Sequence, residues 1–157
     1  MARQSELFAI AFGALSIGVL VYVLDRQAEF VYFLPGWLSL HTQVGSVFGS
    51  IGDYLPTFIH VYAFILLTVV VAVPAITKLI PVCLAWLIVD TLFEVAQIEA
   101  IAQWLAGHTP GWFSGIPFLE NTTDYFLMGT FDALDLLSIT AGTLAAYLTV
   151  IFLARRI

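Results

Sequence analysis

Four carboxylates associated with apolar segments are the residues of this sequence best suited to chemistry. Asp90 and Glu94 lie inside the apolar stretch from Leu79 to Ile98, and Asp132 and Asp135 stand at the start of the last apolar stretch. A carboxylate at membrane depth costs at least about 2.5–3.5 kcal/mol on insertion scales, so it requires a partner or a function. Carboxylates held close together suit general acid–base catalysis or a proton relay.

Helical spacing brings polar side chains together on single faces. Glu94 follows Asp90 by four positions and Gln97 follows Glu94 by three, which is one face of an α-helix. Asp132 and Asp135 are three positions apart in the same way. The candidate acid/base residues are Glu94, Asp135, Asp132 and His60, and the predicted supporting polar network contains Gln97, Asp90, Tyr62 and Gly142.

Three roles fit these residues. The first is acid–base chemistry, and the second is the binding of a divalent cation by several oxygen ligands and one histidine. The third is purely structural: the buried acids cap the last helix and form hydrogen bonds with Gln97, His60 and Tyr62 across the bundle. Asp132 and Asp135 are favourable first-turn residues on helix-dipole grounds alone. Gly142 is small enough to let a neighbouring helix approach closely.

The elements that must position these residues are membrane-spanning helices. The chain is 61% hydrophobic and 10% charged, with a mean hydropathy of +1.01, whereas soluble domains carry about 25% charged residues. A spanning helix needs roughly 20 apolar residues. The sequence predicts an all-α, polytopic membrane protein, with residues 1–157 as one membrane domain. Its four-helix transmembrane bundle comprises helices over about residues 7–24, 57–73, 79–98 and 134–153.

Composition excludes several function classes. The net charge is -6 and the five Lys and Arg residues form no stripe, which argues against a nucleic-acid partner. Cys83 is the sole cysteine, so an internal disulfide or a cysteine-rich zinc site is excluded. No nucleophile triad, phosphate loop or haem signature occurs. Whether the protein is an enzyme, and which cofactor it uses, stays open.

The few cations predict the orientation. Four spans place both termini and the short turn from Pro74 to Lys78 on one side of the membrane. That side holds Arg3, Lys78, Arg155 and Arg156, whereas the other side holds only Arg26. The positive-inside rule therefore places both termini in the cytoplasm. In this topology Glu94, Gln97, Asp132, Asp135 and His60 share the outer level, and Asp90 lies about one turn deeper.

Two long loops, over about residues 25–56 and 99–133, face outward and are rich in aromatic residues. Pro35-Gly36-Trp37 and Pro110-Gly111-Trp112 repeat the same combination of turn and aromatic anchor. Aromatic rings favour the headgroup level of a bilayer, so the loops are predicted to contain short interfacial helices. They form either an aromatic belt or a hydrophobic lid that admits a lipid or lipid-linked molecule.

The polar residues and their order resemble the VanZ-like family of bacterial integral membrane proteins. The resemblance rests on His60 in FIHVYAF, Glu94 and Gln97 in FEVAQ, and Asp132 and Asp135 in FDALDLLSITAG, with Gly142 in place. It covers about residues 57–147. The family's founding member is associated with low-level teicoplanin resistance. The resemblance therefore implies envelope or lipid-linked chemistry in a bacterial inner membrane, without defining a reaction.

One departure from the family pattern concerns charge. The family usually has an Arg just before the acidic pair, where this chain has Met128-Gly129-Thr130. A metal ion, a bound proton or another subunit is expected to supply the missing positive charge. The function expected on this basis is the binding or processing of an envelope lipid or lipid-linked glycan at an outward-facing acidic pocket. The alternative is a non-enzymatic accessory subunit of a larger membrane complex.

Overall fold

The structure, a computed structural model, describes residues 2–27, 31, 36–41, 46–72, 78–117 and 119–155, and within these it contains helices and no strand. The expected all-α class is thus confirmed. The elements are α1 Ala2–Asp25, η2 Gly36–Leu38, α2 Ile51–Ala72, α3 Leu79–Val95, α4 Glu99–Gly107, η4 Gly111–Phe113, η5 Leu119–Asn121, α5 Thr122–Met128 and α6 Ala133–Arg155.

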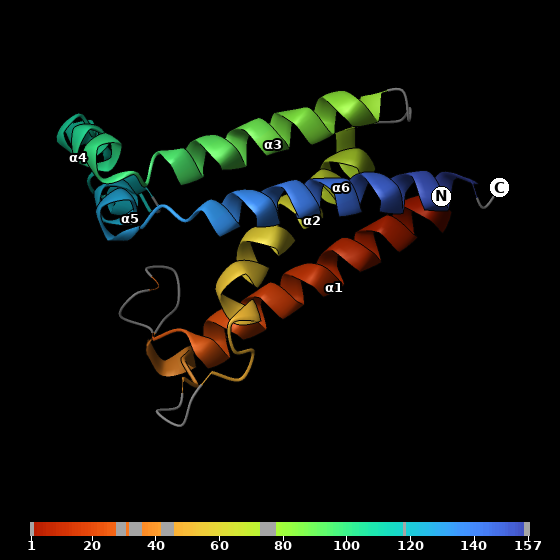
Figure 1. The fold of residues 1–157 in the computed structure, drawn as a ribbon, viewed down its shortest axis with the longest axis horizontal. Helices are drawn as coiled ribbons and strands as arrows, with labels where there is room; N and C mark the ends of the chain where they lie inside the picture. Colours follow the sequence, from red (N-terminus) through yellow and green to blue (C-terminus); the bar gives the residue numbers. More distant parts are fainter. Residues whose placement is uncertain are drawn as a thin grey trace.

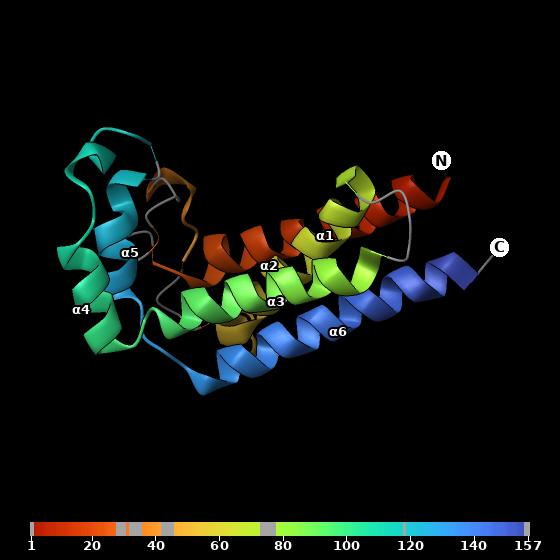
Figure 2. The same cartoon turned by 90° about the horizontal axis from the view of Figure 1, so that it is seen from above.

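Helices α1, α3 and α6 run lengthwise, α2 crosses obliquely between them, and the short helices gather at one end (Figures 1 and 2). Here α4 and α5 lie beside each other at the end that we call the loop end. The beginning of α1 and the end of α6 lie at the opposite, terminus end. Helix α2 packs against α1, α3 and α6, and α3 also packs against α6. Of the predicted turn from Pro74 to Lys78, residues 74–77 lie outside the described residues, and Lys78 directly precedes α3.

Among the described residues, three helices are long and apolar enough to cross a membrane: α1 over Gln4–Asp25, α2 and α6. Helix α3 counts as a fourth span only together with α4, and the two are bent by 91°. Many large apolar side chains on these helices point outward, among them Phe12, Leu84 and Leu148. In water they would form an unusually large exposed apolar surface, whereas a bilayer would cover them.

The predicted helix over residues 79–98 is too long. Helix α3 ends at Val95, and Ile98 is extended, with φ -60° and ψ 125°, before α4 begins at Glu99. The chain turns here because α4 buries Ala102 as it packs against α5. Gln97 consequently lies in the turn beyond α3 instead of on the helix face that carries Asp90 and Glu94.

Helix α2 begins at Ile51, earlier than the predicted Thr57, and includes Pro56. Proline has no backbone N–H, so the carbonyl of Gly52, four residues earlier, lacks its usual helical donor. Arg26 compensates: its Nη2 atom lies 3.4 Å from the Gly52 oxygen and 3.4 Å from the Asp53 oxygen. A guanidinium from the end of α1 therefore stabilises a first turn that the proline alone would weaken.

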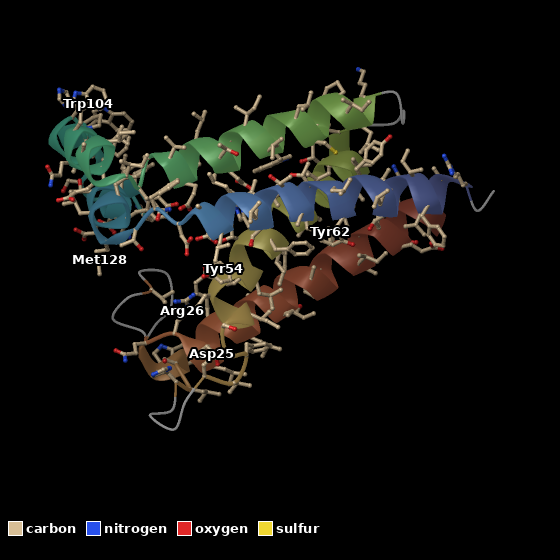
Figure 3. The ribbon with its side chains drawn as sticks, in the orientation of Figure 1. Asp25, Arg26, Tyr54, Tyr62, Trp104 and Met128 are labelled. Carbon is tan, nitrogen blue, oxygen red and sulfur yellow. The ribbon has the colours of Figure 1, made fainter. Side chains whose placement is uncertain are left out.

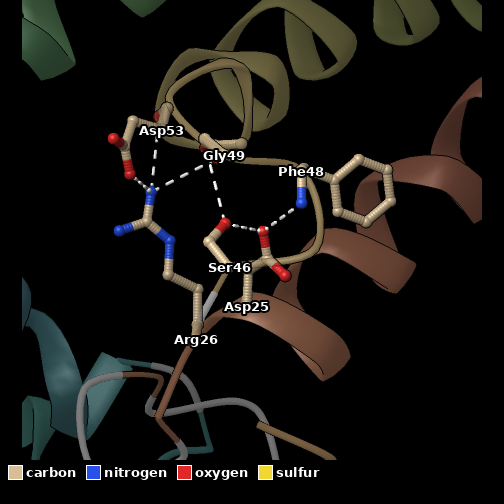
Figure 4. A network of polar contacts seen from close by, with 7 residues as sticks. Asp25, Arg26, Ser46, Phe48, Gly49 and Asp53 are labelled. Atoms are coloured by element: carbon tan, nitrogen blue, oxygen red, sulfur yellow. Dashed lines mark hydrogen bonds and ion pairs between the residues drawn. The ribbon is translucent and has the colours of Figure 1, made fainter. Parts of the chain in front are cut away.

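Asp25, the last residue of α1, fixes the segment that leads into α2 (Figure 4). Its carboxylate accepts hydrogen bonds from the backbone N–H of Val47 at 2.7 Å and of Phe48 at 2.8 Å, and also from the Ser46 hydroxyl. A carboxylate is the group best suited to hold successive N–H donors. The loop end of α1 is thus tied to the start of α2.

Replacing Asp25 with alanine should loosen this segment while leaving the bundle folded. The Val47 and Phe48 amides should exchange with solvent about tenfold faster, which is the ratio expected for loss of one hydrogen bond. Hydrogen exchange followed by mass spectrometry measures this. Glu6→Ala, which removes an exposed carboxylate from the other end of α1, is the control. Unchanged exchange in the Asp25 variant would contradict the assigned role.

Candidate functional site

Glu94 of α3 and Asp132 meet at the loop end. The Glu94 residue is only 6% exposed, and its Oε1 atom accepts the backbone N–H of Asp132 at 2.7 Å. The Asp132 carboxylate in turn accepts the N–H of Leu134 at 2.8 Å, so it caps the start of α6. The cap satisfies one of the free N–H groups of the first helical turn. The predicted site residues Glu94 and Asp132 are thus in contact, through the Glu94 side chain and the Asp132 backbone.

Helix α2 reaches the same cluster through hydroxyl groups. The Tyr54 hydroxyl lies near the Asp132 carboxylate, and the Thr57 hydroxyl lies near that of Asp135. The Oδ1 atom of Asp135 is buried and has no hydrogen-bond partner among the described residues. Tyr54 and Arg26 lie close to the start of α6 in Figure 3. We call Glu94, Asp132 and Asp135 the acidic cluster.

Arg26 supplies positive charge that the sequence reasoning did not assign to this site. Its Nη2 atom forms an ion pair with Asp53 Oδ1 at 3.3 Å, and its charge also acts on Asp135. It is the one Lys or Arg that the sequence places away from the terminus end. The sequence did contain a signal for this role of Arg26. Arg26 directly follows α1, and the end of α1 and the start of α6 were expected on the same side of the membrane. The cluster therefore has a countercharge from within the chain.

His60 and Asp90 form a second pair, below the acidic cluster. His60 Nδ1 lies 3.3 Å from each Asp90 carboxylate oxygen. The Asp90 side chain is 8% exposed, whereas that of His60 is 52% exposed. Thr57 precedes His60 by three residues on α2, so His60 lies about 4.5 Å further along the α2 axis than Thr57. The structure thus pairs His60 with Asp90, and not with the outer-level acids beside which it was expected.

Aromatic rings hold the His60 imidazole in place. The ring centroid of Phe64 lies 4.4 Å from that of His60, and the Trp86 ring stands edge-on to His60 at 6.2 Å. Trp86 itself donates its indole N–H to the Thr68 hydroxyl at 3.0 Å. The imidazole is therefore fixed both by a hydrogen bond and by packing.

The other predicted supporting residues have separate partners. Gln97 donates to the Tyr125 hydroxyl at 3.4 Å. Tyr62 contacts the Thr149 hydroxyl at 3.2 Å, nearer the terminus end than Tyr54 (Figure 3), so it does not join the acidic cluster. Gly142 lies where α2 and α6 cross, and a Cβ atom there would stand 2.6 Å from the Phe58 carbonyl oxygen.

A divalent cation was one of the three roles that the sequence left open, and the geometry gives it no support. No group of three or more His, Cys, Asp or Glu side chains in the described part of the chain is arranged to hold a metal ion. The site offers hydrogen-bonding groups instead. These are the carboxylate oxygens of the acidic cluster and the His60 imidazole on the α2–α3 side.

The helices and their apolar outer faces define the class of protein. It is all-helical in the described residues, with three helices, or four if α3 and α4 form one bent span, apolar enough for a multi-pass membrane protein. Comparison of the chain with family models, curated proteins and solved structures finds no match.

Proposed function

We propose that this chain is a VanZ-like protein of a bacterial inner membrane, with both termini in the cytoplasm. In this proposal it binds an envelope lipid or lipid-linked glycan at the acidic cluster, at the outer membrane surface. The ligand's polar part, a hydroxyl or an amine, would donate hydrogen bonds to Asp135 and Asp132. The aromatic loops at the same end would contact its apolar part.

One observation carries this proposal: the buried Asp135 oxygen that lacks a partner in the described residues. A buried acceptor that stays unpaired costs roughly 1–3 kcal/mol, and in a bilayer no bulk water is at hand to satisfy it. A bound donor would recover that free energy. Support for a membrane ligand comes from the exposed aromatic side chains of the loop end, such as Trp37 and Trp112.

The test of this proposal is neutralisation of the cluster. Asp135→Asn and Glu94→Gln keep the side-chain shapes but remove the carboxylate charge. Each should lower retention of the co-purifying lipid at least about tenfold, the factor that corresponds to one hydrogen bond of 1.4 kcal/mol. Lipid extraction followed by mass spectrometry measures the retained lipid, and circular dichroism of the same samples checks the fold. Full lipid retention in both variants would contradict the proposal.

An accessory role in a larger membrane complex is the second candidate. The observation that favours it is the 81% exposure of Trp37, which a partner protein could cover as well as a lipid. This candidate predicts stoichiometric co-purification of other chains, and little effect of Asp135→Asn.

A further inference from the structure

The half-exposed imidazole of His60 has an unassigned nitrogen on the outer side of the bundle. Nδ1 is committed to Asp90 at 3.3 Å, and the structure gives Nε2 no hydrogen-bond partner within the described residues. In α2, a candidate span, an unpaired polar atom on the outward face would meet lipid. Each unsatisfied polar group in hydrocarbon costs several kcal/mol, so a ligand for Nε2 would be strongly favoured.

The Asp90 bond determines which chemistry Nε2 offers. An ionised carboxylate only accepts hydrogen bonds, so the proton of this bond belongs to Nδ1. In the neutral imidazole Nε2 is then the acceptor, and it requires a donor from the ligand. Phe64 and Trp86 keep the ring from rotating, which holds Nε2 in one direction.

Charge selects among possible donors and disfavours anions. Asp90 and Glu94 of α3 face this region, and Asp132 and Asp135, at the start of α6, lie nearer the loop end. Arg26 is the cation near these carboxylates, and its ion pair is with Asp53. A phosphate group would be repelled by this arrangement, whereas a neutral hydroxyl would not.

We infer that the His60–Asp90 pair is a binding site for the hydroxyl group of a neutral membrane lipid, separate from the acidic cluster. The lipid hydroxyl donates to His60 Nε2, and Asp90 acts as a positioning residue that fixes the imidazole tautomer. The aromatic rings of Phe64 and Trp86 provide the adjacent apolar contact for the lipid's hydrocarbon. The inference deepens the proposed function and rests on it for the membrane origin of the ligand.

Dioleoylglycerol is the probe, added to the full chain in phosphatidylcholine nanodiscs, which carry no lipid hydroxyl. The 15N resonance of His60 Nε2 is followed in a His41→Gln/His108→Gln background, which leaves His60 as the single histidine. We expect a saturable change of this resonance. Dioleoylglycerol whose hydroxyl is acetylated should cause none, and dioleoyl phosphatidic acid should bind at least about tenfold more weakly.

Variants separate recognition from folding. The double replacement His60→Leu/Asp90→Leu removes the pair without leaving a lone buried charge, and a dioleoylglycerol carrying a photoreactive group should then label the α2–α3 side at least about tenfold less. Asp90→Asn should change the tautomer of His60, which the two ring 15N resonances record. If Asp90 had a merely structural role, this replacement would leave the tautomer unchanged.

Three results would overturn the inference. The acetylated lipid or phosphatidic acid binds as well as dioleoylglycerol; no lipid gives a saturable change; or a second copy of the chain covers His60, seen as a dimer in nanodiscs. Failure here is distinguishable from failure of the proposed function. Loss of lipid retention in Asp135→Asn, with no titration of His60, would leave the acidic cluster as a site and remove this one.

Discussion

Replacing Gly142 with leucine should force α2 and α6 apart and destabilise the protein by about 3 kcal/mol, the upper end of the usual cost of overpacking. A Cβ at this position would stand 2.6 Å from the Phe58 carbonyl oxygen and 2.6 Å from the Val61 Cγ1 atom. The carbonyl belongs to the backbone of α2, so relief requires movement of a whole helix. Because α6 carries Asp135 and begins directly after Asp132, the acidic cluster would be disrupted as well.

The chain offers a matched control. Gly13 lies in α1, and a Cβ atom there would meet nothing within 4 Å, so Gly13→Leu should change stability little. Thermal unfolding of both variants in the same detergent, followed by tryptophan fluorescence, measures the difference. Equal stability of the two variants would show that α2 and α6 do not cross at Gly142.

Replacing His60 alone with leucine should destabilise the protein by about 3 kcal/mol, because it leaves the Asp90 carboxylate buried without its partner. The double replacement His60→Leu/Asp90→Leu should instead lie within about 1 kcal/mol of the unmodified chain, since apolar residues of similar size replace a buried pair at little cost. Asp90→Leu alone should have an intermediate effect, since the half-exposed imidazole that remains can be neutral.

These three variants form a double-mutant cycle. The fraction folded at increasing SDS in mixed micelles gives the unfolding free energies. A coupling of about 2 kcal/mol or more between the two positions is the expected outcome. Additive effects would mean that the 3.3 Å contact between His60 and Asp90 contributes no interaction energy.

Sequence patterning predicted the helices well because their length and composition are set by the membrane. The spans expected over residues 7–24 and 134–153 fall inside α1 and α6. The start of α2 was predicted at Thr57 instead of Ile51, and the guanidinium of Arg26 that supports the turn before Pro56 comes from a distant segment. Such a bond leaves no local pattern.

The site was predicted less completely than the fold. Helical spacing and the predicted topology together placed Glu94 near the start of α6, where its bond to the Asp132 N–H is found. Periodicity could not show that His60 would pair with Asp90, because that depends on the rotation of α2 against α3. Nor could it show the bend after Val95, because the apolar character of the sequence continues through Ile98.

The central claim is that the acidic cluster binds a lipid or lipid-linked molecule from the membrane. Mass spectrometry of the intact particle, released from mild detergent, tests it most directly. We expect a single chain carrying a bound lipid of defined mass, and loss of that mass in Asp135→Asn and Glu94→Gln while the particle stays folded. A stoichiometric set of partner chains with no bound lipid would contradict it.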